Sequence, residues 1–193
     1  MNKISEIDIK LGFCKNAVPS FEFASPNECK KAIQNIFPKL DPSVKEFQYL
    51  KEYDEVANYL SNTKGKGLFL SGDVGRGKSV LAEYVIPYMF YHRFTKVIAR
   101  CPAIELGPRY EEIKPKRFLV IDDVGTEGVY KSYGNEYLPF VDIVDIAERQ
   151  GTYLIITTNL KFDEFVKRYG KRTIDRLVRL CEFVKFEGDS LRK

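Results

Sequence analysis

Residues 72–79 constrain the fold of this chain more than any other segment. They read Gly-Asp-Val-Gly-Arg-Gly-Lys-Ser, which fits the pattern G-x-x-x-x-G-K-[ST]. A short apolar run, residues 67–71, precedes them, and residues 79–93, which follow, are apolar almost all round. Glycines let such a loop curl so that its backbone N–H groups point at phosphate oxygens, and the next helix presents its positive end to the same anion. The pattern predicts a strand, a phosphate-binding loop and a helix, in that order.

The ligand expected in this loop is a nucleotide with Mg²⁺. The Lys78 ammonium can reach the β- and γ-phosphates, and the Ser79 hydroxyl can ligate Mg²⁺. The residues predicted to contact the nucleotide are Gly72, Asp73, Val74, Gly75, Arg76, Gly77, Lys78, Ser79 and Val80.

Apolar runs alternate with helical segments from residue 67 onward. Strands are expected at residues 67–71, 96–100, 118–121, 153–157 and 183–186. Helices are expected at residues 79–93, with Pro87 as a kink or an end, at residues 135–150, and twice more before the last strand. Only 17 residues separate Arg100 from Phe118, which leaves room for at most one short helix. This alternation predicts a three-layer α/β/α fold around a five-stranded parallel sheet.

The first part of the chain is expected to be a short helical extension. Ser25, Pro26 and Glu28 have the spacing of a capping box at the start of a short helix. A second, longer helix is expected to begin at Asp41 and to end at residues 62–65. Its apolar positions are Val44, Phe47, Leu50, Tyr53, Ala57 and Leu60. Residues 1–24 show no clear period. We divide the chain into an extension, 1–45, which could bind a partner, and a nucleotide-binding domain, 46–193.

Two acidic residues follow the third expected strand. Asp122 and Asp123 come directly after four apolar residues, so they are expected at the carboxyl edge of the sheet, where ligands of open α/β sheets bind. Asp122 is predicted to hold Mg²⁺, and Asp123 to orient and deprotonate the attacking water. A plain turn of two aspartates is the simpler alternative.

Polar and basic residues near the end of the chain complete the candidate set. Asn159 ends the fourth strand, where it could hold the attacking water, or it could cap a turn. On the helix that follows, Ile174, Leu177, Val178 and Cys181 are expected to face inward. Arg172, Arg176 and Arg179 align on another face, either for a phosphate partner or as a solvated basic surface.

Composition limits the classes that remain. The net charge of +4 is weak evidence for any partner. The one histidine and the four cysteines, which form no Cys-x-x-Cys pair, argue against a zinc or dithiol centre, and reduced thiols are expected. The N-terminus has no apolar segment of a signal peptide, and the most apolar run, residues 85–91, is too short to span a bilayer. A cytoplasmic protein without a membrane partner is expected.

Taken in order, five motifs resemble the DnaC/IstB branch of AAA+ ATPases. They are the phosphate loop, Ile-Asp-Asp-Val-Gly-Thr-Glu at 121–127, Thr-Thr-Asn-Leu at 157–160, Tyr-Gly-Lys-Arg-x-x-Asp-Arg-Leu at 169–177, and Gly-Asp-Ser-x-Arg at 188–192. The resemblance implies that Asn159 is the sensor-1 residue and Arg192 the sensor-2 arginine. It implies that Arg176 is an arginine finger for ATP in an adjacent subunit, with Arg172 as a helper. Glu127 matches the pattern but receives no role.

The same resemblance implies what the protein does. Members of this branch lack a C-terminal helical lid, and only seven residues follow Phe186 here. They bind DNA as ATP-dependent oligomers, and the loaders among them grip a replicative helicase through an N-terminal segment. The short crossover before Phe118 departs from the branch, which has a DNA-contacting helix there. A helicase loader that binds single-stranded DNA, self-associates and hydrolyses ATP slowly is therefore expected.

Other functions stay open at this point. A transposition helper ATPase belongs to the same branch and would engage a transposase. A small nucleotide or nucleoside kinase matches the length, and an ATP-gated adaptor that barely hydrolyses ATP has the same motifs. A small GTPase would need Asn-Lys-x-Asp, whereas residues 159–163 read Asn-Leu-Lys-Phe-Asp.

Overall fold

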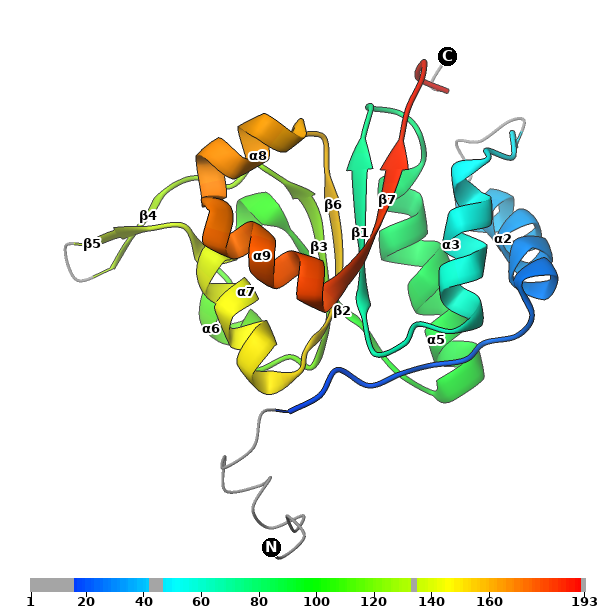
Figure 1. The fold of residues 1–193 in the computed structure, drawn as a ribbon, viewed down its shortest axis with the longest axis horizontal. Coiled ribbons are helices and arrows are strands. Elements are labelled where there is room, and N and C mark those ends of the chain that lie inside the picture. The colour runs from blue at the N-terminus through cyan, green and yellow to red at the C-terminus, as the bar shows by residue number, and fades with distance from the viewer. Residues whose placement is uncertain (1–15, 42–46, 133–134, 192–193) are drawn as a thin grey trace, which may run out of the picture.

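The computed structural model describes residues 16–41, 47–132 and 135–191. Its centre is a parallel five-stranded sheet with the strand order β2-β3-β6-β1-β7, flanked by helices on both faces (Figure 1). The strands are β1 (Gly67–Gly72), β2 (Ala99–Pro102), β3 (Phe118–Val124), β6 (Tyr153–Thr158) and β7 (Cys181–Phe186). The predicted three-layer fold is confirmed. Because β1 lies between β6 and β7, the loop after β1 emerges between the ends of these two strands.

Each face of the sheet has its own helical layer (Figure 1). One layer contains α2 (Pro26–Leu40), α3 (Glu52–Ser61) and the continuous helical segment α4 (Lys78–Val80), η1 (Leu81–Val85) and α5 (Ile86–Phe94). The other contains η2 (Ala103–Glu105), α6 (Tyr110–Ile113), α7 (Pro139–Gln150), α8 (Phe162–Tyr169) and α9 (Lys171–Leu180). Alternate residues of β1 show why both layers bind: Leu68 and Leu70 belong to the first core, and Phe69 to the second.

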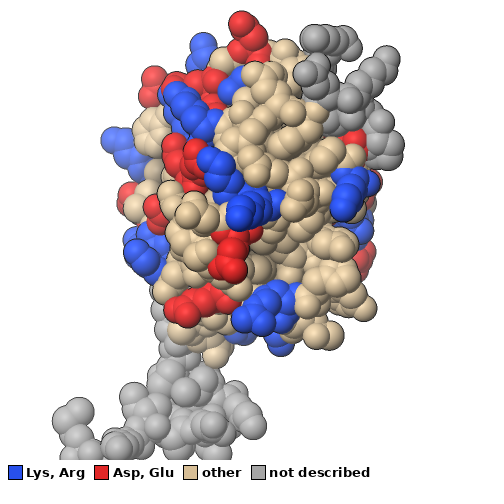
Figure 2. All heavy atoms as spheres, turned by 90° about the vertical axis from the view of Figure 1, so that its right-hand side faces the viewer, with Lys and Arg blue, Asp and Glu red and all other residues tan. Residues whose placement is uncertain are grey.

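A large part of the surface on the α2 side of the molecule is uncharged. Figure 2 views the molecule from the side that carries α2, and uncharged side chains form a broad continuous area there. Most of the acidic side chains in that view lie toward its left side.

The N-terminal helices agree with the sequence in part. Ser25 caps α2, and Glu28 completes the predicted capping box. The predicted second helix is wrong in its start: Asp41 caps the C-terminus of α2, and the next helix, α3, begins at Glu52. Residues 47–50 are not helical, and the Phe47 ring packs on those of Phe37 and Tyr53. Val44 lies outside the described residues.

The helix after the phosphate loop passes through Pro87 without ending. Residues 81–85 form one π-helical turn just before it, and the helix continues to Phe94. Proline has no N–H for the carbonyl four residues earlier, that of Glu83, and the Arg100 guanidinium donates to this carbonyl at 3.2 Å. The wider turn and the arginine together account for the absence of a break.

Two other predicted boundaries are wrong because they depend on which strands pair with each other. The second strand, predicted at residues 96–100, begins at Ala99, where its pairing with β3 starts. Lys96 and Val97 precede the strand and are exposed. The helix predicted at 135–150 begins at Pro139, and residues 135–137 form β5 (Asn135–Tyr137) of a hairpin with β4 (Tyr130–Ser132). Gly151 ends α7 in the left-handed conformation. The crossover before β3 holds only η2 and the four-residue α6, as its length predicted.

The described part of the extension shares the core of the domain. Phe21 and Phe23 are buried, and so are Cys29, Ile33 and Phe37 of α2. Residues 16–41 therefore pack as part of the same body, and the boundary at 45/46 stays a prediction.

Three of the four cysteines lie in the described residues. Cys29, Cys101 and Cys181 are buried free thiols. Within residues 16–41, 47–132 and 135–191, no helix is both long and apolar enough to cross a bilayer.

Candidate nucleotide-binding site

The phosphate loop curls between β1 and α4, as its glycines predicted. Gly72, Gly75 and Gly77 all have positive φ, at 117°, 78° and 82°. A side chain at Gly75 would also place its Cβ 2.0 Å from Ser190 Oγ. Only glycine meets both requirements, so these positions give the loop a backbone suited to an anion.

Lys78 lies at the centre of the site. Its side chain is buried, and its ammonium donates to the carbonyls of Gly72 and Asp73 at 2.9 and 2.7 Å. It also donates to Asn159 Oδ1 at 2.8 Å. The loop thus folds around its own lysine and joins it to the tip of β6.

Asn159 links the lysine to the second acid. Its Nδ2 donates to Asp123 Oδ1 at 2.7 Å, while its Oδ1 accepts from Lys78. The ammonium can only donate and the carboxylate accepts, so this amide orientation is the one that satisfies both neighbours. Three residues predicted separately from sequence, Lys78, Asn159 and Asp123, are brought into one hydrogen-bonded chain.

An irregular end of β3 aims the two aspartates. Their side chains would point to opposite faces in a regular strand. The pairing of β3 with β6 shifts register between Ile121 and Val124, and Asp123 has a φ of 57°. The Thr157 hydroxyl spans this irregularity: it donates to Asp122 Oδ1 at 2.6 Å and accepts from the Asp123 N–H at 2.8 Å. Sequence reasoning singled out only Asn159 at this tip and missed Thr157.

The donors near the loop fit Mg²⁺ in chemistry. Ser79, in the first turn of α4, and Asp122 offer the hydroxyl and carboxylate oxygens that this ion prefers. In the part of the chain that the structure describes, no three His, Cys, Asp or Glu side chains gather as a ligand set. Such a site would therefore rely on phosphate oxygens and water beside Ser79 and Asp122. Glu83, one helical turn beyond Ser79, has a raised pKa because of burial and the nearby charge of Asp122.

A buried ion pair fastens the loop to α3. Glu52, whose side chain is 1% exposed, accepts from Arg76 Nη2 at 3.1 Å and from the Glu187 N–H at 3.1 Å. Burial opposes the charge of Glu52, but hydrogen bonds from backbone N–H groups and from Arg76 outweigh it, so its pKa is lowered. Sequence reasoning missed Glu52, because an acid in the first turn of a helix is ordinary.

The segment after β7 also contacts the loop. The Leu191 N–H donates to the Gly75 carbonyl at 3.0 Å, and the Gly188 N–H donates to Asp73 Oδ2 at 2.8 Å. Arg192, the predicted sensor-2 residue, lies outside the described residues. Its described neighbour Leu191 is at the phosphate loop.

Glu127 has a structural environment away from the loop. It is buried and accepts from the Gly125 N–H at 2.8 Å and from the Tyr169 hydroxyl. Burial and this carboxylate raise the pKa of Tyr169. Glu127 therefore ties the turn after β3 to the end of α8.

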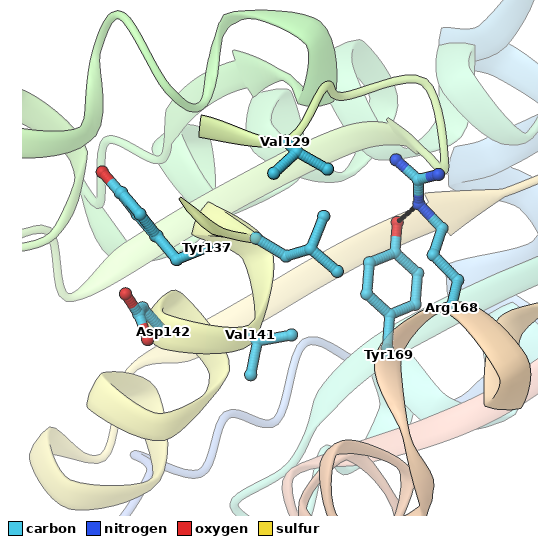
Figure 3. Close-up of a pocket in the computed structure, with 7 residues that line it drawn as sticks. Val129, Tyr137, Val141, Asp142, Arg168 and Tyr169 are labelled. Carbon is cyan, nitrogen blue, oxygen red and sulfur yellow. Dashed lines mark hydrogen bonds between the residues drawn. The ribbon is translucent and has the colours of Figure 1, made fainter. Parts of the chain in front are cut away.

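A hollow of about 310 Å³ lies beside this contact (Figure 3). It is lined by Val129, Tyr137, Leu138, Val141, Asp142, Arg168 and Tyr169. None of the predicted nucleotide-binding residues is among them.

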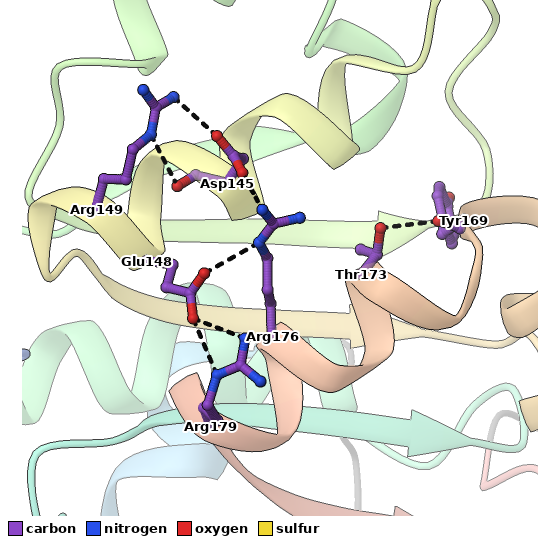
Figure 4. Close-up of polar contacts among 7 residues, drawn as sticks. All are labelled: Asp145, Glu148, Arg149, Tyr169, Thr173, Arg176 and Arg179. Carbon is purple, nitrogen blue, oxygen red and sulfur yellow. Dashed lines mark hydrogen bonds and ion pairs between the residues drawn. The ribbon is translucent and has the colours of Figure 1, made fainter.

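The arginines of α9 are arranged differently from the prediction. Arg176 pairs with Asp145 and with Glu148, the latter at 3.0 Å, and Arg179 Nη2 pairs with Glu148 at 2.8 Å (Figure 4). Only 11% of the Arg176 side chain is exposed. Arg176 and Arg179 therefore do not form a free basic row, although Arg172 is exposed.

The inward face of α9 also needs correction. Its buried residues are Thr173, Leu177 and Leu180, whereas Val178 is exposed. Cys181 is buried but begins β7. Leu177 is buried as predicted and Ile174 packs against the core, so within the helix only Val178 departs from the predicted face.

Comparisons with known proteins place the fold. No protein-family model matches the sequence, and no curated protein matches it. The structure is similar to the DnaC helicase loader, with a TM-score of 0.59 and 16% identity, over 78% of this chain and 98% of that one.

Two further structures share the arrangement. A putative primosome component from Streptococcus pyogenes serotype M3 has a TM-score of 0.52 and 19% identity, over 88% of this chain and 83% of that one. AMPPCP-bound DnaA from Aquifex aeolicus has a TM-score of 0.54 and 17% identity, over 79% of this chain and 53% of that one. At these identities the similarity defines the fold alone: the chain shares the α/β fold of these structures, with helices around a parallel five-stranded sheet.

Proposed function

We propose that this protein is an ATP-dependent helicase loader. It binds ATP and Mg²⁺, associates with copies of itself, binds single-stranded DNA and engages a replicative helicase. The observation that carries the nucleotide part is the hydrogen-bonded chain of Lys78, Asn159 and Asp123 at the phosphate loop. The similarity to a helicase loader and to a primosome component supports the replication part.

Each residue of the candidate site has a distinct role in the proposed hydrolysis of ATP. Lys78 and the loop N–H groups bind the phosphates, and Ser79 and Asp122 hold the metal. Mg²⁺, when bound, neutralises charge on the phosphate oxygens. Asp123 accepts the proton of the attacking water at its carboxylate, and Asn159 orients that water. When Lys78 turns to a phosphate, Asn159 Oδ1 becomes available to the water.

The test of the site compares two variants with a control. Lys78→Ala removes the ammonium and should abolish binding of ATP and Mg²⁺ in calorimetry. Asp123→Asn keeps an oxygen that accepts from Asn159 but cannot take a proton. It should retain binding and lose ATP hydrolysis by about 10²-fold or more. Asp163→Asn, an exposed acid on α8, should change neither property.

The outcomes separate the proposal from its alternatives. Hydrolysis that survives Asp123→Asn would contradict the general-base role. ATPase rates that rise with protein concentration and with single-stranded DNA support the loader. Copurification with a replicative helicase supports it further. A transposase in its place would indicate a transposition helper, and phosphoryl transfer to a nucleoside without self-association would indicate a kinase.

A further inference from the structure

Three exposed tyrosines lie along the helix that follows the phosphate loop. Tyr84, Tyr88 and Tyr91 are 45%, 41% and 54% exposed. Their spacing of four and three residues places them on one face, and residues between them such as Val85 and Phe90 fill the core. The tyrosines are therefore not needed to bury the helix.

The segment that carries these tyrosines is positively charged, and two acids border it: Glu83 precedes Tyr84, and Glu28 of α2 lines one hollow with Tyr88. Residues 84–100 contain no aspartate or glutamate, and they include the exposed cations Arg93, Lys96 and Arg100. The Arg100 guanidinium lies 5.5 Å from the Tyr84 ring centre and is held by its hydrogen bond to the Glu83 carbonyl. This segment thus alternates aromatic rings with positive charge.

A shallow hollow adjoins the middle of the face. It has a volume of about 290 Å³ and lies between α2 and α5. Tyr88, His92 and Arg93 line it from α5, and the rings of Tyr88 and His92 lie 4.2 Å apart, centre to centre. From α2 it is lined mainly by small and apolar residues, with the capping-box acid Glu28 at one end. The hollow exposes ring surface beside a cation.

We propose that Tyr84, Tyr88, Tyr91 and His92, with Arg93, Lys96 and Arg100, form a binding surface for single-stranded DNA. Aromatic side chains stack on bases of any sequence, and neighbouring cations neutralise the phosphates between them. The lack of acids in residues 84–100 matches a polyanion better than a protein surface of mixed charge. This inference rests on the proposed function, because it locates the DNA contact of that function.

Stacking is tested by variants that differ in ring and hydroxyl. Fluorescence anisotropy would follow a labelled oligothymidylate titrated with the full chain, with Mg²⁺ and a non-hydrolysable ATP analogue present. Tyr88→Ala/Tyr91→Ala should weaken DNA binding by about tenfold or more, because each removed ring can no longer stack on a base. Tyr88→Phe/Tyr91→Phe keeps the rings and should bind like the parent. Phe162→Ala is the matched control, since Phe162 is 67% exposed on α8, in the opposite layer.

Charge is tested by the salt dependence of the same titration. Arg93→Ala/Lys96→Ala should reduce the slope of log affinity against log salt by about 0.7 for each lost phosphate contact. Crosslinking of halogenated oligonucleotides, mapped by mass spectrometry, should place adducts on residues 84–92. All the substituted side chains are exposed, so unchanged thermal unfolding is expected and is measured alongside.

Three other outcomes overturn the proposed DNA-binding surface. DNA binding unchanged in the alanine pair, with the parent binding DNA, would leave the loader function standing and remove this surface from it. No DNA binding by a parent that hydrolyses ATP and captures helicase would remove both this surface and the DNA-binding part of the proposed function, and would leave its ATP and helicase parts standing. Loss of helicase capture with intact DNA binding would make the surface a protein-docking site. Conversely, tyrosine-dependent DNA binding by a chain that fails to bind ATP would support the surface while contradicting the loader function.

Discussion

Thr157 determines how the two aspartates are held at the candidate site. One hydroxyl donates to the Asp122 carboxylate and accepts from the Asp123 N–H, at 2.6 and 2.8 Å. Asp123 adopts a left-handed φ of 57°, which costs about 1 kcal/mol or more for a residue with a side chain. The hydrogen bond to Thr157 helps to offset this cost, so the threonine acts as a positioning residue rather than as a ligand.

Removing this hydroxyl should affect the metal more than the nucleotide. Thr157→Val keeps the volume and β-branching but leaves the Asp123 N–H without its acceptor. We expect the Mg²⁺ concentration that gives half-maximal ATPase activity to rise by about tenfold, from a loss of about 1.5 kcal/mol. Titration of ATPase activity with Mg²⁺ measures this shift.

The conservative variant separates positioning from packing. Thr157→Ser restores the hydroxyl and should restore the parent's Mg²⁺ dependence, although it removes a buried methyl group. Thr152→Val, at a buried threonine just before β6, is the control and should leave the Mg²⁺ dependence unchanged. If serine and valine variants behaved alike, Thr157 would have only a packing role.

At the scale of elements, the ion pair of Glu52 and Arg76 joins α3 to the phosphate loop. Both side chains are buried, and Glu52 also binds the Glu187 N–H after β7. The folded-state pKa of Glu52 is lowered, so its ionised form is favoured in the folded protein. The resulting stability is present above the unfolded pKa of about 4.3 and is lost as pH falls through and below that value.

Glu52→Gln should therefore destabilise the protein in a pH-dependent way. We expect the free energy of unfolding at pH 7 to fall by about 2 kcal/mol, because charge-assisted hydrogen bonds are weakened. The difference from the parent should narrow as pH is lowered from about 5 toward 3, where the parent's carboxylate becomes protonated. Urea unfolding at several pH values measures both trends.

A second glutamate on α3 provides the comparison. Glu55→Gln changes an exposed side chain three residues further along the helix and should cost less than about 0.5 kcal/mol. A constant difference between Glu52→Gln and the parent over the whole pH range would contradict the linkage to Glu52.

The elements themselves show which parts of the fold local sequence can predict. All five sheet strands were expected, because each is a short apolar run that ends near a polar residue. The start of α3 and the shift of β2 were missed, since they depend on Asp41 capping the preceding helix and on where β3 offers a partner. The β4–β5 hairpin was missed because residues 135–137 were assigned to the following helix and residues 130–132 to no element.

The candidate site likewise contains residues that local sequence predicts and residues that only distant contacts reveal. Lys78, Asp122, Asp123 and Asn159 could be named because polar residues that end parallel strands meet at one edge. Glu52 could not, because its importance comes from Arg76 and from Glu187, which is 135 residues away. The contacts of Arg176 with α7 were also beyond prediction, since they depend on acids in another helix.

At the scale of the whole molecule, the arginines of α9 determine how copies of the chain would cooperate. Arg176 is bound by Asp145 and Glu148 of its own chain, so a role at a neighbour's ATP requires it to exchange these carboxylates for a phosphate. Both partners are acids on the surface of α7, and the exchange replaces one charge pair by another. The proposed oligomer would thus compete with an internal contact, which fits slow hydrolysis by the isolated chain.

Mixing two inactive variants tests whether the site is shared. Arg176→Ala lacks the finger and should lose about 10³-fold in ATPase rate, while Lys78→Ala lacks the phosphate-binding lysine. In an equal mixture assembled head to tail, about a quarter of the interfaces combine an intact loop with an intact finger and should hydrolyse ATP. Arg179→Ala, which also removes a partner of Glu148 but at an exposed position, should stay active alone.

Recovery in the mixture cannot come from a purely structural role of Arg176. If Arg176→Ala only loosened α7 from α9, the damaged subunit would stay damaged whatever its neighbour carried, and thermal unfolding would shift to lower temperature. Recovery at equal mixing, with an unfolding temperature close to that of Arg179→Ala, would place Arg176 across the interface. If no mixing ratio restored activity, the contacts with Asp145 and Glu148 would be the whole role of Arg176, and the exposed Arg172 would be the next residue to test by the same mixture.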